Sequence, residues 1–173
     1  PTSMLLYWGV SWEADEDEFF TGKRELLTAG NTPKPIQTGF EMLAQLQPKR
    51  LKVIKNKKNS RLGMIATRSQ EKMVFLVYNY EESDGEKVSG NDIINIQLSG
   101  LKNKLNYKVE SIPLDENNNN TYQTWRSTGS PINSKSIDLE PLKKAATLNK
   151  VKPFDLQTNG DGELNFDVNL KRR

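Results

Sequence analysis

The strongest constraint on the fold of this chain is a two-residue hydrophobic period that recurs along its second half. The clearest segment is residues 164–170, where Leu, Phe, Val and Leu alternate with Asn, Asp and Asn. Residues 94–99 and 105–109 show the same alternation. Because successive side chains of a strand point to opposite faces of its sheet, each segment predicts a strand with one buried face.

Two further strands are predicted over residues 62–67 and 73–80, with residues 69–72 as the hairpin loop between them. Residues 73–78 are apolar at every position, which predicts a strand at the centre of its sheet and places Tyr78 among inward-facing neighbours. About five or six strands of this kind predict an antiparallel β-sandwich.

A helical insert interrupts the strands between about residues 116 and 150. Tyr122 and Trp125 are three residues apart, which makes them neighbours on one short helical turn. Gly129 can adopt the left-handed conformation that stops a helix, and Pro131 prevents the helix from resuming. A second helix is expected from about Asp138. We expect Trp125 to anchor the insert onto the sandwich rather than to serve as a surface platform for sugar.

The first 47 residues follow a different pattern. Residues 4–10 form a continuous apolar run, typical of a strand buried on both faces, as in a parallel barrel. Nothing else in the chain could cover both faces, so we expect further sequence upstream. Residues 13–18 are strongly acidic and predict an exposed loop. A helix is expected to begin near Pro35 and to end at Pro48. Its apolar stripe consists of Ile36, Phe40, Leu43 and Leu46.

The composition excludes several kinds of chemistry. The chain has no cysteine and no histidine, so it cannot form a disulfide or a nucleophile–histidine pair. Its net charge of +3 comes from scattered residues, and we expect the densest basic run, residues 55–58, to be a solvated loop rather than a nucleic-acid site. No apolar run approaches the roughly 20 residues that span a bilayer. The compartment stays open between secreted, periplasmic and cytoplasmic.

Four oxygen-bearing residues alternate around a glycine-rich turn near the C-terminus. They are Asp155, Asn159, Asp161 and Glu163. The spacing is faintly like a calcium loop, but the helix-flanked loop of twelve residues is absent. We therefore expect a simple hairpin turn there and predict no metal and no cofactor.

Three blocks of sequence carry a family resemblance. The first contains Leu26, Leu27, Thr28, Pro33, Lys34, Pro35, Phe40, Leu43 and Leu46. The second contains residues 63–67 and 74–79. The third contains Asp115, Asn120, Tyr122, Trp125, residues 129–131, Leu142, Ala145, Ala146 and Leu148. In this order, the blocks resemble the C-terminal region of glycoside hydrolase family 39, which includes β-xylosidases and α-L-iduronidases.

The resemblance implies that residues 1–47 are the last strand and helix of a (β/α)8 barrel, and that residues 48–173 are a β-sandwich with the helical insert. The family's sandwich ends with one more apolar strand, and we expect this chain to stop before it. The family's two catalytic glutamates belong to earlier barrel strands, so both are expected upstream of Pro1. The Asn-Glu-Pro tripeptide of the family's acid/base is absent. We expect no catalytic residue and no hydrolysis by this chain alone.

The resemblance implies that this chain contributes one wall of the sugar site. Tyr7 and Trp8 match a Tyr-Trp pair of the xylosidase branch that can stack on a pyranose ring, and packing in the barrel core is an equal alternative for Trp8. Asp15 and Glu16 occupy the positions of a Glu-Glu pair and can accept hydrogen bonds from sugar hydroxyls. A solvated acidic loop is the favoured alternative, because residues 13–18 are strongly acidic. Trp12 departs from the branch pattern by replacing an acidic residue. The strand lacks the iduronidase arginine, which favours a neutral sugar such as xylose.

These observations predict the C-terminal accessory part of a retaining, β-xylosidase-like hydrolase, which braces the barrel and lines the sugar site. Its partners would be the upstream catalytic barrel and a xyloside-type carbohydrate, with no nucleic acid or membrane. One alternative is a stand-alone carbohydrate-binding module, which needs exposed coplanar aromatics, whereas the alternation turns Tyr78 and Tyr107 inward. The other is a structural immunoglobulin-like module, which has no use for residues 1–47.

Overall fold

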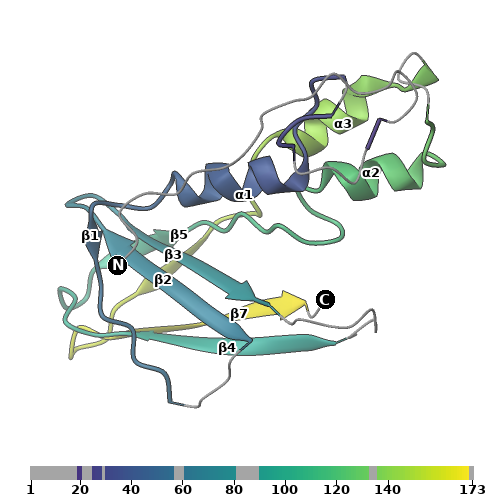
Figure 1. Cartoon of the computed structure of the whole chain (residues 1–173). Coiled ribbons are helices and arrows are strands. Elements are labelled where there is room, and N and C mark those ends of the chain that lie inside the picture. Colours follow the sequence, from purple (N-terminus) through teal and green to yellow (C-terminus); the bar gives the residue numbers. More distant parts are fainter. Residues whose placement is uncertain are drawn as a thin grey trace. The chain divides into compact units, whose positions relative to one another are not determined.

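The computed structural model describes residues 19–20, 25–28, 30–56, 61–80, 90–132 and 136–171. The elements are α1 (Pro35–Leu43), β1 (Lys49–Arg50), β2 (Leu62–Arg68), β3 (Met73–Asn79), β4 (Asn91–Leu98), β5 (Asn106–Val109), α2 (Thr121–Ser127), α3 (Leu139–Ala146), β6 (Phe154–Gln157) and β7 (Leu164–Lys171). Every strand pair formed by these elements is antiparallel, so the expected mainly β chain with a few helices is confirmed (Figure 1). Within the described ranges, none of the helices has the length and hydropathy to cross a lipid bilayer.

The chain divides into two compact units. The first unit comprises Pro1–Glu41 and Ile112–Val151, and the second comprises Met42–Ser111 and Lys152–Arg173. Helices α2 and α3 therefore belong to the same unit as the described residues that precede α1. The predicted domain boundary between residues 47 and 48 stays a prediction.

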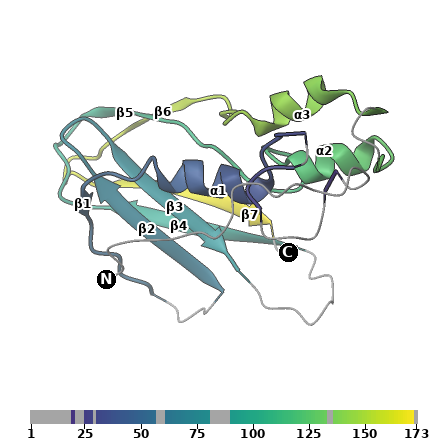
Figure 2. The same ribbon diagram turned by 45° about the horizontal axis from the view of Figure 1, so that its top comes forward.

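In the second unit, the strands form three antiparallel groups, ordered β1-β2-β3, β4-β7 and β5-β6. The hairpin of β2 and β3 pairs Leu62 with Asn79 and Arg68 with Met73. Ser69 closes its turn, because its N–H donates to the carbonyl of Lys72 at 2.9 Å. Figure 2 shows the long β2–β3 and β4–β7 pairs of this unit from above.

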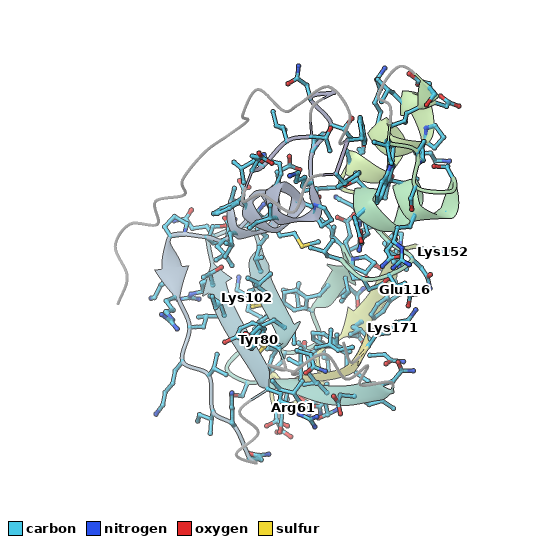
Figure 3. All side chains as sticks on the ribbon, turned by 45° about the vertical axis from the view of Figure 1, so that its right-hand side comes forward. Arg61, Tyr80, Lys102, Glu116, Lys152 and Lys171 are labelled. Atoms are coloured by element: carbon cyan, nitrogen blue, oxygen red, sulfur yellow. The ribbon has the colours of Figure 1, made fainter. Side chains whose placement is uncertain are left out.

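The alternation predicted the inward faces of β4 and β7 correctly. Ile96 is 3% exposed and Leu164 is 5% exposed, while the Asn and Asp side chains between the apolar residues of β7 are exposed. Phe75 of β3 contacts Phe166 of β7, with ring centroids 6.4 Å apart. The side chains of the second unit are drawn in Figure 3, which labels Arg61 and Tyr80 at the open end of the β2–β3 hairpin.

The predicted position of β3 is wrong. Among the described strands, β2 is the central strand of its sheet and β3 is an edge. Tyr78 is also not inward-facing, because it is 48% exposed. An unbroken apolar run shows that a strand has two apolar faces, but the neighbours that cover those faces are fixed by the tertiary structure.

Helix α1 differs from its prediction in length and in the face that it buries. Pro35 begins it, as expected, but the helix ends at Leu43. Leu46 lies beyond the helix in a turn, where its N–H donates to the carbonyl of Leu43 at 3.1 Å. The buried side chain of α1 is Thr38, at 0% exposed, whereas Ile36 is 42% exposed. The predicted apolar stripe is therefore wrong at Ile36, because periodicity groups residues on a face but does not say what covers it.

Local capping explains where α2 begins and ends. The side-chain oxygen of Asn120 accepts from the N–H of Gln123 at 3.1 Å, which satisfies an N-terminal donor of the helix. At the other end, Gly129 has φ +90° and Ser130 donates to the carbonyl of Trp125 at 3.3 Å. This is a Schellman motif, and it confirms the predicted stop at Gly129. The predicted second helix is confirmed too, since Asp138 caps α3.

Candidate functional site

The residues predicted to face the sugar lie outside the described part of the chain. Tyr7, Trp8, Asp15 and Glu16 all precede Phe19, where the described residues begin. Their roles in stacking on a sugar ring and in accepting hydrogen bonds stay predictions. What the structure describes is the support that follows them in the sequence, in the first compact unit.

Four aromatic rings join residues 19–20 to helix α2, and we call them the aromatic cluster. The ring centroid of Phe20 lies 5.5 Å from that of Tyr122 and 5.1 Å from that of Trp125. Tyr122 and Trp125 are 5.6 Å apart, and Phe19, which is 1% exposed, lies 5.5 Å from Phe20. These separations are typical of attractive aromatic pairs, so the cluster holds the two segments together.

Trp125 anchors α2 onto the N-terminal residues of the first unit, a partner that the sequence did not suggest. The described rings in contact with it are Phe20 and Tyr122, and its Nε1 donates to the carbonyl of Pro131 at 3.0 Å. The predicted anchoring onto the sandwich stays a prediction, and these contacts of Trp125 lie within the first unit. The available signal was the Phe-Phe pair directly after the acidic run, because a solvated loop does not need two consecutive large aromatics.

The segment after the cluster contains a buried ion pair. Nζ of Lys34 lies 2.6 Å from Oε2 of Glu25, and the two side chains are 8% and 4% exposed. Such a pair is stable only when both charges keep their partners, since an isolated buried charge is costly. The sequence placed Lys34 in a resembling block without giving it a role, and it did not single out Glu25.

A tight turn brings these two residues together. The N–H of Lys34 donates to the carbonyl of Leu26 at 2.8 Å, and the N–H of Thr28 donates to the carbonyl of Thr32 at 2.9 Å. Gly30 is required within this turn, because a Cβ atom there would lie 2.8 Å from Cε2 of Phe19. The turn is thereby fitted against the aromatic cluster.

Helix α2 is also bonded to this turn directly. Thr121, at 0% exposed, donates its hydroxyl to the carbonyl of Pro33 at 2.7 Å. A buried hydroxyl with a specific partner fixes the register of the two segments, because a shift would leave it unsatisfied. The first turn of α2 is thus bound to the residues that lead into α1.

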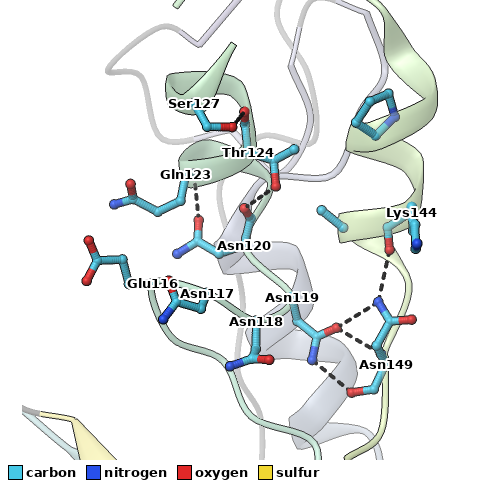
Figure 4. A pocket seen from close by; sticks show the side chains of 12 residues that line it. Glu116, Asn117, Asn118, Asn119, Asn120, Gln123, Thr124, Ser127, Lys144 and Asn149 are labelled. Carbon is cyan, nitrogen blue, oxygen red and sulfur yellow. Dashed lines mark hydrogen bonds between the residues drawn. The ribbon is translucent and has the colours of Figure 1, made fainter. Parts of the chain in front are cut away.

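The polar run before α2 is an ordered joint rather than a solvated stretch. Asn119 is 5% exposed, donates to the carbonyls of Pro113 at 2.6 Å and Asn149 at 3.0 Å, and accepts from the N–H of Asn149 at 2.8 Å. The carboxylate of Asp115 accepts from the N–H of Asn117 at 2.7 Å. These bonds join the entrance of α2 to the exit of α3 (Figure 4).

A polar groove of about 500 Å³ lies beside this joint, between α2 and α3 (Figure 4). It is lined largely by amides, of which Asn119 and Asn120 use their side chains to hold the helices. The groove therefore has the chemistry of a structural joint, since its buried amides are already engaged within the chain.

The glycine-rich turn near the C-terminus is tight, as expected, but the predicted hairpin is wrong, because the flanking strands β6 and β7 pair with β5 and β4 rather than with each other. Oδ1 of Asn159 accepts from the N–H groups of Asp161 at 3.0 Å and Glu163 at 2.7 Å. That oxygen therefore serves the backbone of the turn. In the described part of the chain, no group of three or more Asp and Glu side chains is placed to hold a metal ion.

The described chain is thus mainly β, with antiparallel sheets and a few short helices, and the comparisons with known proteins identify its family. The family model described as glycosyl hydrolases family 39 matches residues 10–163. The chain therefore belongs to glycosyl hydrolase family 39.

Two relatives show how much of such a protein this chain represents. A "Beta-xylosidase" of Caldicellulosiruptor saccharolyticus is 28% identical over 151 residues, which cover 87% of this chain and 30% of that protein. The crystal structure of the GH39 enzyme from Xanthomonas axonopodis pv. citri matches with a TM-score of 0.71 at 12% identity, over 90% of this chain and 31% of that chain. The second likeness concerns the fold alone. The chain thus spans slightly less than a third of the length of either relative.

Proposed function

We propose that this chain is the C-terminal accessory part of a retaining, β-xylosidase-like glycoside hydrolase, and that it braces the loop after the last barrel strand. Family membership supports the hydrolase class, and the named relative supports a xyloside as substrate. The catalytic barrel is the partner, and it would lie in the other two thirds or so of the polypeptide, as the share of the relatives suggests.

The observation that carries the proposal is the aromatic cluster. If residues 1–47 are the last strand and helix of the barrel, residues 19–34 form the loop between them. Loops at the C-terminal ends of barrel strands build the active sites of this fold. Phe20 packs on Tyr122 and Trp125, so α2 holds the loop that would border the sugar.

The β1-β2-β3 sheet and the β4-β7 pair would lie in opposite layers of a β-sandwich, with Phe75 and Phe166 between them. The helical insert leaves this sandwich to join the described N-terminal residues, which is what a brace requires. An immunoglobulin-like module would have no use for that contact, and the bond from Thr121 to Pro33 therefore favours the brace over this alternative.

At the sugar itself, Tyr7 and Trp8 would offer an aromatic face, and Asp15 and Glu16 would accept hydrogen bonds from hydroxyls of a neutral sugar. Cleavage with retention needs two carboxyl groups roughly 5–5.5 Å apart, one as nucleophile and one as acid/base. Both would come from the upstream barrel.

The purified 173-residue chain tests the first part of the proposal. We expect it to leave a chromogenic aryl β-xyloside intact, and hydrolysis by this chain would overturn the assignment of catalysis to the barrel.

The full polypeptide, which contains both the catalytic barrel and this chain, tests the brace. Phe20→Ala and Trp125→Ala are expected to lower kcat/KM about tenfold to a hundredfold, because a misplaced site loop loses its alignment with the substrate. The matched control is Phe154→Ala, an aromatic of the second unit that is 46% exposed. Unchanged kcat/KM in both cluster variants, with folding intact, would contradict the brace.

A further inference from the structure

Two exposed tyrosines of the second unit lie at the open end of the β2–β3 hairpin, and neither belongs to the aromatic cluster of the first unit. Tyr78, the penultimate residue of β3, is 48% exposed, and Tyr80, just beyond the strand, is 65% exposed. Large aromatic side chains usually bury most of their surface, so two exposed ones in close succession suggest a binding surface.

The outer end of the Tyr78 ring lies against the backbone of β2 at Gly63. Gly63 is its cross-strand partner, and the Tyr78 ring occupies the place where a Cβ atom of residue 63 would be. Only glycine permits this close approach. The end of the Tyr78 ring is therefore held against β2 at Gly63, while the residue stays 48% exposed and accessible to a ligand.

Tyr80 extends the same surface. Its N–H donates to the carbonyl of Arg61 at 2.7 Å, so the pairing of the hairpin continues one position past the end of β3 (Figure 3). Residues two apart on a strand share a face, and their Cα atoms are separated by roughly 6.5–7 Å. Tyr78 and Tyr80 thus lie on one face, opposite to the face from which Phe75 meets Phe166.

The neighbours of the two rings decide the class of ligand. The described side chains of β2 and β3 on this face are Ile65, Thr67, Val74 and Leu76, all uncharged, and Arg61 stands opposite Tyr80. The ammonium of Lys55, which donates to the carbonyl of Leu62, adds a second cation at this end, and two cations at one end are not the continuous basic groove that single-stranded nucleic acid needs. The two partly exposed tyrosines offer roughly 200–300 Å², far below the ~800 Å² per partner of a stable protein interface. A neutral ligand with flat apolar faces and hydroxyl groups fits this surface.

We propose that Tyr78 and Tyr80 form a platform that binds a neutral saccharide chain, separate from the sugar site proposed for the barrel. The C–H faces of successive sugar rings would stack on the two tyrosine rings, and sugar hydroxyls would bond to the phenol oxygens. The platform requires no hydrolysis, so it stands or falls independently of the brace. The proposed surface would bind sugar in the way expected of a carbohydrate-binding module, without the whole chain being one.

The test is calorimetric titration of the purified chain with xylohexaose, cellohexaose and a six-residue oligodeoxynucleotide. We expect weak binding of a hexasaccharide and about tenfold weaker binding after Tyr78→Ala or Tyr80→Ala, as the loss of one stacked ring implies. Gly63→Ala, which displaces the Tyr78 ring, is expected to weaken binding similarly while both tyrosines remain. Phe154→Ala is the control of matched exposure and should bind as the unmodified chain does.

Three results would overturn the proposal. They are no binding of either hexasaccharide, equal binding by the Tyr80→Ala variant, and stronger binding of the oligonucleotide than of the sugars. Tyr80→Ala keeps the test valid if Tyr78→Ala or Gly63→Ala fails to fold, because Tyr80 is largely exposed and lies outside the strand. Circular dichroism on each variant identifies a folding failure.

Discussion

Replacing Lys34 by methionine should destabilise the chain far more than the same change at an exposed lysine. The Lys34–Glu25 pair is 2.6 Å long with side chains 8% and 4% exposed, so solvent screens it little. Removing one partner of a buried pair typically costs about 3–5 kcal/mol, because the other charge stays buried and loses that counter-ion. For a chain of this size, that loss corresponds to a fall of about 6–20 °C in Tm.

The matched control is Lys143→Met on α3. Lys143 makes a bond of nearly equal length, 2.7 Å, to Glu140, but their side chains are 64% and 78% exposed. We expect no measurable change in stability there, because water screens exposed pairs. The double change Glu25→Leu with Lys34→Met should recover most of the loss, since buried pairs can be replaced by apolar residues.

Urea denaturation followed by circular dichroism, together with thermal melts, measures these differences. The reasoning would be refuted if Lys34→Met and Lys143→Met had the same midpoint, or if the double variant were no more stable than Lys34→Met. Either result would mean that burial does not distinguish the two pairs.

Three further predictions concern local features. Asn120→Ala removes the cap of α2 and should cost about 1–2 kcal/mol in urea denaturation, whereas the exposed Asn117→Ala should cost much less. Gly30→Ala should cost about 1–3 kcal/mol, because the added Cβ would press on Phe19; an unchanged melting temperature would show that the ring moves aside freely. Glu140 raises the pKa of Lys143 through a hydrogen bond, so the ion pair should persist below pH 10.5 and be lost only as the pH rises beyond it; an NMR titration of the Lys143 side chain should give a higher pKa in the chain than in Glu140→Gln.

The sequence by itself determined the elements whose signals are local. The alternation of apolar and polar residues located β4 and β7, Asp138 and Gly129 located a helix start and a helix stop, and the three resembling blocks indicated the family. These signals are reliable because strand faces, caps and left-handed stops depend on a few adjacent residues.

The tertiary structure alone decided which faces are covered and which distant residues meet. It paired Phe20 with Trp125, more than a hundred positions later in the chain, and it brought Glu25 to Lys34. It also placed Tyr78 at an edge, over Gly63, where the apolar run had suggested the interior. A hydrophobic period shows which residues of an element form an apolar face. Which residues cover that face depends on how the whole chain packs.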